Sequence, residues 1–228
     1  MLYLEADTVH DFSHVERVYW MALQLAEREA ADREVVAAAA LLHDVIGSSP
    51  GSGQREEHHL VSALFAESVL VKQNWKADKI AAVQHCIRAH RFRSDSETPE
   101  SIEAKVLFDA DKLDVLGAAG VARTIAYAAH AGEPIYTKPS DKFMASGEKE
   151  NSEPHSAYHE YIFKLQHIKD RMFTASGRKM AAERHDYLVG FFERLAWEMS
   201  GAADNLIEKT ERMDVDAPLT GRNANTGS

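Results

Sequence analysis

The sequence predicts an all-α protein that folds as a single-domain helical bundle. Apolar residues recur at the three- and four-residue spacing of amphipathic helices along most of the chain. The sequence has no sustained alternation of polar and apolar residues and no Asn-Gly hairpin signal, so it does not predict β-strands. The chain has 228 residues, of which 45% are hydrophobic and 27% are charged. That length and balance suit one globular domain with a sizeable core.

The first three predicted helices lie in the N-terminal third of the chain. Ser13 is a plausible N-cap for a helix over 13–30. The second helix, over 33–46, contains the apolar run AAAALL and ends at Gly47, where the loop SSPGSG begins. A third helix is predicted over 55–72.

The next three predicted helices surround a polar loop and a bend. Helices over 77–89 and 102–116 flank the loop RSDSETPES, whose proline lies close to the start of the second of them. Gly117 and Gly120 mark a bend into a helix over 121–131.

The last third of the sequence begins with an irregular stretch over 132–154, which holds five Gly or Pro residues and many charges. It is too long for a simple turn, so the sequence predicts either disorder or a functional lid there. Helices over 157–172 and 178–199 follow.

We assign residues 1–205 to one domain, because no repeat and no linker separates two cores. Its expected parts are a core over 10–131 and C-terminal helices over 157–200. Residues 206–228 form a polar tail that we expect to be disordered.

Charge and cysteine content limit the functional classes. The net charge of −10 makes the chain a poor general binder of nucleic acid. Its single cysteine, Cys86, excludes an internal disulfide and a thiolate zinc cluster, and fits a reducing, cytoplasmic location. No apolar run approaches the roughly 18 residues of a membrane span, and the acidic N-terminus does not resemble a secretion signal, so we expect no membrane association.

Histidine and aspartate supply the functional signal. The chain has 12 His and one Cys. The pair His43-Asp44 ends a very apolar helix, where buried ionisable groups need partners. His14, at the start of the first helix, and Asp111, in the string FDADKLD, would complete a set of two His and two Asp from three helices. That mix favours Mn²⁺, Fe²⁺, Co²⁺, Ni²⁺ or Mg²⁺ over structural zinc, and catalytic Zn²⁺ stays possible.

The ordered pattern H…HD…D resembles the HD superfamily of metal-dependent phosphohydrolases. The strings VHDFSHVERV, AALLHDVI, HCIRAHRF and DADKLDVLGAAGVAR are similar to successive motifs of the small bacterial YedJ-type HD-domain proteins, and ASGRKMAAERHDYLVGFFERL is also similar. The resemblance covers roughly the first 200 residues. It implies an HD-type helical bundle.

The resemblance also implies roles for individual residues. His14, His43, Asp44 and Asp111 match the positions of the four metal ligands. His85 and His90 match the motif between the HD pair and the last aspartate, where binuclear HD enzymes add histidines for a second metal ion. His90 is the better candidate, with His59 or His58 as its partner, so one or two divalent ions per chain are expected.

Three residues are candidates for catalysis. Asp44 could hold the nucleophilic water as well as a metal ion, and His90 or His85 could act as a general acid. Lys112 follows the last ligand, where a cation could contact a substrate phosphate. Arg91, in the run HRFR, could also bind a substrate phosphate. Other cations available for the developing charge are Arg88, Arg93 and Arg123.

Several of these residues also have a purely structural interpretation. His58 and His59 could lie on the surface. His85 and His90 are five positions apart, so they cannot share one helix face. Asp109, Asp111 and Asp114 could form a solvated acidic face. We expect Cys86 to be a small buried hydrophobic side chain.

The leading functional hypothesis is a metal-dependent phosphohydrolase that cleaves a phosphoester of a nucleotide or of another small phosphorylated metabolite. One alternative is an HD-fold di-iron oxygenase, which needs two bound irons. Another is a non-catalytic module that senses a nucleotide or a metal ion. A homodimer is possible.

Overall fold

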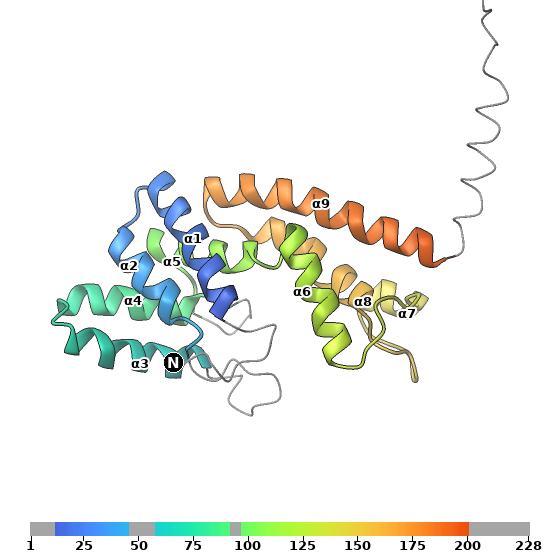
Figure 1. Cartoon of the computed structure of the whole chain (residues 1–228), viewed down its shortest axis with the longest axis horizontal. Coiled ribbons are helices and arrows are strands. Elements are labelled where there is room, and N and C mark those ends of the chain that lie inside the picture. The colour runs from blue at the N-terminus through green and yellow to red at the C-terminus, as the bar shows by residue number, and fades with distance from the viewer. Residues whose placement is uncertain (1–11, 46–57, 92–96, 201–228) are drawn as a thin grey trace, which may run out of the picture.

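The computed structural model describes residues 12–45, 58–91 and 97–200. Every regular element in these ranges is a helix, which confirms the predicted all-α fold (Figure 1). The N-terminal half contains α1 (Phe12–Arg28), α2 (Arg33–Leu42), α3 (His58–Lys72), α4 (Ala77–Ala89) and α5 (Ile102–Leu113). The C-terminal half contains α6 (Gly117–His130), α7 (Asp141–Ser146), α8 (Ala157–Phe163), the 3₁₀ helix η1 (Leu165–Arg171) and α9 (Ala175–Met199).

Helix α5 is the central element of the N-terminal half. It packs against α1, α2, α4 and α9, and the residues over 106–110 are all buried. Ser101 caps it, because its side-chain oxygen accepts a hydrogen bond from the backbone N–H of Ala104 at 3.1 Å. The apolar body of α5 therefore fixes its C-terminal turn, which carries Asp111 and Lys112.

Helix α2 positions the pair His43-Asp44, which directly follows it. Asp32 caps its N-terminus by accepting hydrogen bonds from the backbone N–H groups of Glu34 and Val35. Ala39 and Ala40 are fully buried, and small side chains allow close packing against neighbouring helices. The helix ends at Leu42, so the next two residues lie in a turn that leaves its axis.

Helix α9 begins beside α1 and α5 of the N-terminal half and runs along the C-terminal half (Figure 1). Its start is fixed by Asp109 of α5, whose carboxylate accepts hydrogen bonds from the backbone N–H groups of Phe173 and Thr174 at 2.9 and 2.8 Å. Gly177 is required beside it, because an added Cβ would lie 2.2 Å from Oδ2 of Asp109. The buried side chains of both halves form one continuous hydrophobic cluster.

The stretch over 132–154, predicted to be disordered or a lid, has defined structure and contains α7. The carboxylate of Glu153 organises it. This group accepts hydrogen bonds from the backbone N–H and hydroxyl of Ser140, at 2.8 and 2.6 Å, and lies 3.0 Å from Nε2 of the buried His159. The fold therefore fixes this segment against the start of α8.

Several predicted helix boundaries are wrong. The predicted helix over 157–172 divides into α8 and η1, because the backbone leaves the α conformation at Lys164 (φ −127°, ψ −55°). Helix α6 begins at Gly117 instead of 121, and α9 begins at Ala175, where Thr174 provides the N-cap. The second helix ends at Leu42 and not at 46, because the chain turns away from the helix axis at His43 and Asp44. The predicted start of the third helix at 55 and the polar tail over 206–228 lie outside the described residues.

In the described residues, no helix has both the length and the apolar composition needed to cross a membrane.

Candidate metal centre

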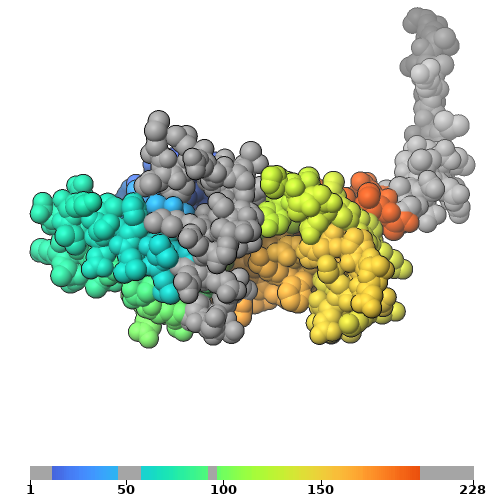
Figure 2. All heavy atoms as spheres, turned by 90° about the horizontal axis from the view of Figure 1, so that it is seen from below, coloured from blue at the N-terminus to red at the C-terminus, as the bar shows by residue number. Residues whose placement is uncertain are grey.

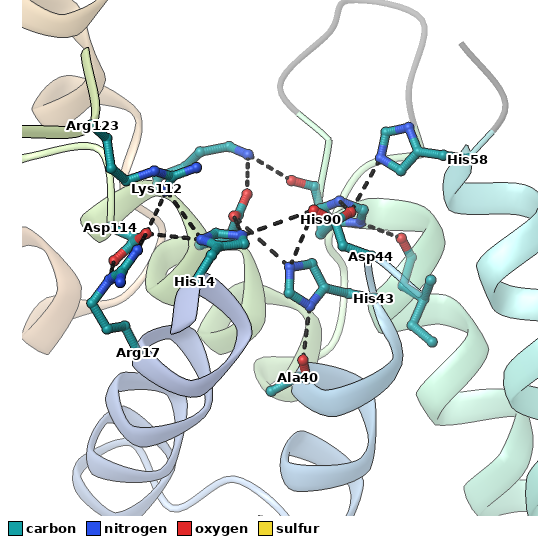
Figure 3. Close-up of polar contacts among 12 residues, drawn as sticks. His14, Arg17, Ala40, His43, Asp44, His58, His90, Lys112, Asp114 and Arg123 are labelled. Carbon is teal, nitrogen blue, oxygen red and sulfur yellow. Dashed lines mark hydrogen bonds and ion pairs between the residues drawn. The ribbon is translucent and has the colours of Figure 1, made fainter. Parts of the chain in front are cut away.

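Three helices bring His14, His43 and Asp111 together. His14 lies in the first turn of α1 and His43 directly follows α2 (Figure 3). Asp111 lies in the last turn of α5. The Nε2 atoms of His14 and His43 lie 3.5 and 4.0 Å from Oδ1 of Asp111. One potential ligand atom from each residue falls within 4.8 Å of the others. This group is a candidate site for one metal ion.

A second group of the same size consists of Asp44, His58 and His90. The Oδ1 atom of Asp44 lies 3.4 Å from Nε2 of His58 and 3.5 Å from Nε2 of His90. The Oδ2 atom of Asp44 faces the first group, at 3.8 Å from Nε2 of His14 and 3.7 Å from Nε2 of His43. Asp44 thus stands between the two groups, with one carboxylate oxygen toward each (Figure 3).

The Nδ1 atoms of three histidines are held by oxygen acceptors, which orients the Nε2 atoms toward the centre. Nδ1 of His43 donates to the carbonyl oxygen of Ala40 at 2.8 Å, and Nδ1 of His90 donates to that of Ile87 at 2.6 Å. A carbonyl oxygen can only accept, so the Nε2 atoms of His43 and His90 keep their lone pairs for a cation. Nε2 of His43 is buried without a hydrogen-bond partner in the described residues. This donor set fits a divalent metal ion.

His14 is oriented by a carboxylate instead of a carbonyl group. Its Nδ1 atom lies 2.8 Å from Oδ2 of the fully buried Asp114. Arg17 donates to both oxygens of Asp114, at 2.7 and 3.1 Å, and Arg123 also donates to Oδ2. Burial alone would raise the pKa of Asp114, but the hydrogen bonds from His14 and Arg17 and the charge of Arg123 hold it well below its usual value. Asp114 is therefore an anionic support for His14.

Electrostatics keep the central residues in the protonation states that metal binding needs. Burial lowers the pKa of the fully buried His43 to about 4, so it is neutral at pH 7. Burial would raise the pKa of Asp44, yet its interactions with His43, His58 and His90 hold that pKa well below the usual value. Burial would likewise raise the pKa of Asp111, but nearby positive charge, above all that of Lys112, holds this pKa well below its usual value. The centre therefore offers neutral imidazole and ionised carboxylates together.

Lys112, predicted to contact a substrate phosphate, lies at the edge of this centre. Its Nζ atom donates to Oδ2 of Asp111 at 2.5 Å and to the carbonyl oxygen of His90 at 3.0 Å. These two contacts join the C-terminal turn of α5 to the end of α4 and place a positive charge beside the potential ligands (Figure 3).

The other predicted site residues lie away from both groups. Nδ1 of His59 lies 3.3 Å from Nη1 of Arg91, and it is the preceding residue, His58, that faces Asp44. His85 is engaged by Glu97, with Nδ1 at 2.6 Å from the carboxylate, and its Nε2 accepts from the backbone N–H of Glu100.

A further candidate cation, Arg88, does not reach the centre. Arg88 donates to the same Glu97 carboxylate as His85. Arg93 lies outside the described residues.

Sequence reasoning missed one residue of the candidate site, Asp114, and left another, His58, undecided. The three-residue spacing of Asp111 and Asp114 placed them on one helix face, but no local signal connected Asp114 to a histidine 100 positions earlier. His58 and His59 are neighbours in one histidine pair, and the direction of α3 decides which of them reaches Asp44.

Comparison with known proteins agrees with this geometry. The HD domain family model matches residues 11–116. The uncharacterized protein YpgQ of Bacillus subtilis (strain 168) is 33% identical over 198 residues, which cover 84% of this chain and 85% of YpgQ.

Solved structures extend the comparison. The crystal structure of Bacillus subtilis YpgQ in complex with ADP superposes with a TM-score of 0.65 at 30% identity, over 85% of this chain and 91% of that one. An HD-superfamily hydrolase from Bacillus thuringiensis superposes with a TM-score of 0.63 at 29% identity, over 84% and 87% of the two chains.

Proposed function

This chain belongs to the HD domain family, and we propose that it is a metal-dependent phosphohydrolase. Its substrate would be a phosphoester of a nucleotide or of a similar small phosphorylated metabolite. The observation that carries this proposal is the position of Asp44, whose two oxygens face two groups of potential ligands. Both groups combine imidazole nitrogen with carboxylate oxygen, as a divalent cation used in phosphoryl transfer requires.

His14, His43, Asp44 and Asp111 would hold the first ion, and Asp44, His58 and His90 would hold a second. A bound divalent ion polarises a phosphoryl oxygen and lowers the pKa of a water molecule. His43 and His90 are held with Nε2 directed inward, and Asp114 fixes His14. The protein's contribution is therefore a set of ligands that is already oriented.

The remaining residues of the centre would act on the substrate and the water. Asp44, ionised despite its burial, can accept a hydrogen bond from the attacking water and align it. Lys112, beside Asp111, supplies positive charge where a phosphate would gain negative charge. His90, not His85, has the position for the additional role of a general acid, which requires that its Nε2 atom carry a proton in place of a second ion.

The proposed substrate class rests on relatives as well as on chemistry. YpgQ was crystallised with ADP, and the Bacillus thuringiensis relative is an HD-superfamily hydrolase. A nucleotide carries a phosphoester that a water molecule activated at this centre could attack, so we infer nucleotide binding for this chain too. The small phosphorylated substrate is also consistent with the net charge of −10, which disfavours a nucleic acid substrate.

Because Asp44 faces both groups of potential ligands, the two groups could also hold two iron ions. A di-iron oxygenase is therefore the second candidate function. Phosphate release from a panel of nucleotides and phosphorylated metabolites, with Mn²⁺, Co²⁺, Ni²⁺ or Mg²⁺ added, decides between them. Metal-dependent release supports the hydrolase. A folded, metal-loaded protein that releases no phosphate, and that retains two redox-active irons after purification, would overturn it in favour of the oxygenase.

A further inference from the structure

A pocket of about 340 Å³ lies between α6 and α8, beside the metal centre. Its walls come from α6, from the segments that precede and follow α6, and from α8 together with the residues at both of its ends. Figure 2 shows the surface of α6, in yellow-green, adjoining the yellow surface of the segment that contains α7 and α8. None of the potential metal ligands lines this pocket.

One side chain connects the pocket to the metal centre. Arg123 lines the pocket, and its Nη1 atom also donates to Asp114 and lies 3.0 Å from Nδ1 of His14. The opposite edge of the His14 ring faces Asp44 and Asp111. Arg123 and the His14 ring therefore stand between the pocket and the carboxylates of Asp44 and Asp111, which makes the pocket a direct neighbour of the metal centre.

The lining favours the nucleoside part of a nucleotide over further phosphate groups. Apolar walls, which include Val115 and Leu165, suit a flat base, and Thr124 and Glu133 add a hydroxyl group and a carboxylate. In the described ranges, no side chain pairs with the Glu133 carboxylate, so it can accept hydrogen bonds from sugar hydroxyls or from an amino group. Glu160, a second carboxylate in the wall, is paired with Lys164 at 2.8 Å. Arg123, His155 and Lys164 also line the pocket, and Lys164 neutralises Glu160, so the preference for a neutral nucleoside comes from the apolar walls and from Glu133.

The pocket is formed before any ligand arrives. The backbone N–H groups of Ala157 and Tyr158, at the start of α8, donate to the carbonyl oxygens of Pro134 and Ile135, both at 3.2 Å. The Glu153–His159 contact at 3.0 Å holds the preceding turn. A preformed wall reduces the ordering cost of binding.

We infer that the α6–α8 pocket binds the nucleoside moiety of a nucleotide whose phosphate lies at the metal centre. This inference rests on the proposed function, because it places the two parts of one substrate in two adjoining sites. Arg123 lies between these sites and can contact the bridging oxygens of the substrate. The pocket then selects nucleotides over phosphorylated compounds that lack a base.

Two probes and a matched pair of variants test the inference. The probes are ADP and inorganic pyrophosphate, with binding to the Mn²⁺-loaded full-length protein measured by calorimetry. Thr124→Phe fills the pocket from α6. Ala126→Phe places the same side chain on the exposed face of that helix, outside the pocket lining. We expect Thr124→Phe to weaken ADP binding by about tenfold or more and to leave pyrophosphate binding unchanged. Ala126→Phe should change neither.

The possible failures are distinguishable. ADP binding that survives Thr124→Phe unchanged would overturn the inference, and so would an equal loss of ADP and pyrophosphate binding. Wild-type protein that binds neither probe in a metal-dependent way would instead overturn the proposed function. Thermal melting checks that each variant is folded. If Thr124→Phe does not fold, Glu133→Gln serves as the second variant, and it should weaken ADP binding several-fold without affecting pyrophosphate.

Discussion

Nδ1 of His14 lies 2.8 Å from Oδ2 of Asp114, a buried carboxylate 100 residues further along the chain. This contact directs Nε2 of His14 toward Asp44 and Asp111, as the backbone carbonyl groups do for His43 and His90. The precision of the metal centre therefore depends on residues that would not touch a metal ion.

Replacing Asp114 should weaken metal binding although Asp114 is not a ligand. Asp114→Asn removes the negative charge that supports His14, and we expect metal affinity to fall about 10- to 100-fold. Calorimetric titration with Mn²⁺ measures this loss. Asp109→Asn is the matched control on the same helix, because Asp109 supports the start of α9. It should lower the melting temperature and leave the affinity unchanged, and the reverse pattern would contradict both assignments.

The two neighbouring histidines of α3 should differ in their effect on metal content. His58→Ala removes a potential ligand that lies 3.4 Å from Asp44, so the number of bound ions should fall. His59→Ala removes a side chain that contacts Arg91, and metal content should not change. Elemental analysis of both proteins after Mn²⁺ loading gives the counts. An equal effect of the two substitutions would contradict the assignment of His58 to the second group.

The stability of the metal-free protein should fall in mildly acidic solution. Burial lowers the pKa of His43 from 6.5 to about 4, so between these values the unfolded state binds a proton that the folded state does not. The resulting stability is fully present above pH 6.5 and is lost as the pH falls toward 4, by about 3 kcal/mol. Urea unfolding at several pH values measures it. The His43→Asn variant should show a shallower dependence in this window, and an unchanged slope would contradict the prediction.

Cys86 should be inert in the native protein. It is fully buried on α4, and burial raises the pKa of its thiol to about 12. A thiol reagent at pH 8 should label it only after unfolding in urea. Rapid labelling of the folded protein would show that α4 opens or that the thiol is reached from the surface.

Much of the fold was predictable because the apolar spacing and end signals of most helices are local. Position 164 shows the limit of that reasoning. The apolar residues over 157–172 suit one continuous helix, but η1 packs against α8 and α9 only because the chain changes direction at Lys164. The stretch over 132–154 was equally hard to interpret, since its order depends on Glu153 and a buried histidine, His159, that its own composition does not reveal.

The candidate site also has a part that could be predicted from the sequence and a part that could not. His14, His43, Asp44 and Asp111 carried a recognisable order along the chain, and the structure places them together. The choice of His58 over His59 depends on the rotation of α3, and the support of Asp114 depends on the packing of α1 against α5. Tertiary contacts of this kind leave no local pattern in the amino-acid sequence.

The most direct test of the account is nucleotide hydrolysis by the Asp44→Ala protein, measured together with its metal content. Asp44 faces both groups of ligands, so its removal should empty the centre and abolish Mn²⁺-dependent phosphate release from nucleotides. His167→Ala, an exposed histidine on η1, is the control and should retain both properties. Full metal content and full hydrolysis in folded Asp44→Ala protein would contradict the assignment of this centre as the site of phosphoester hydrolysis.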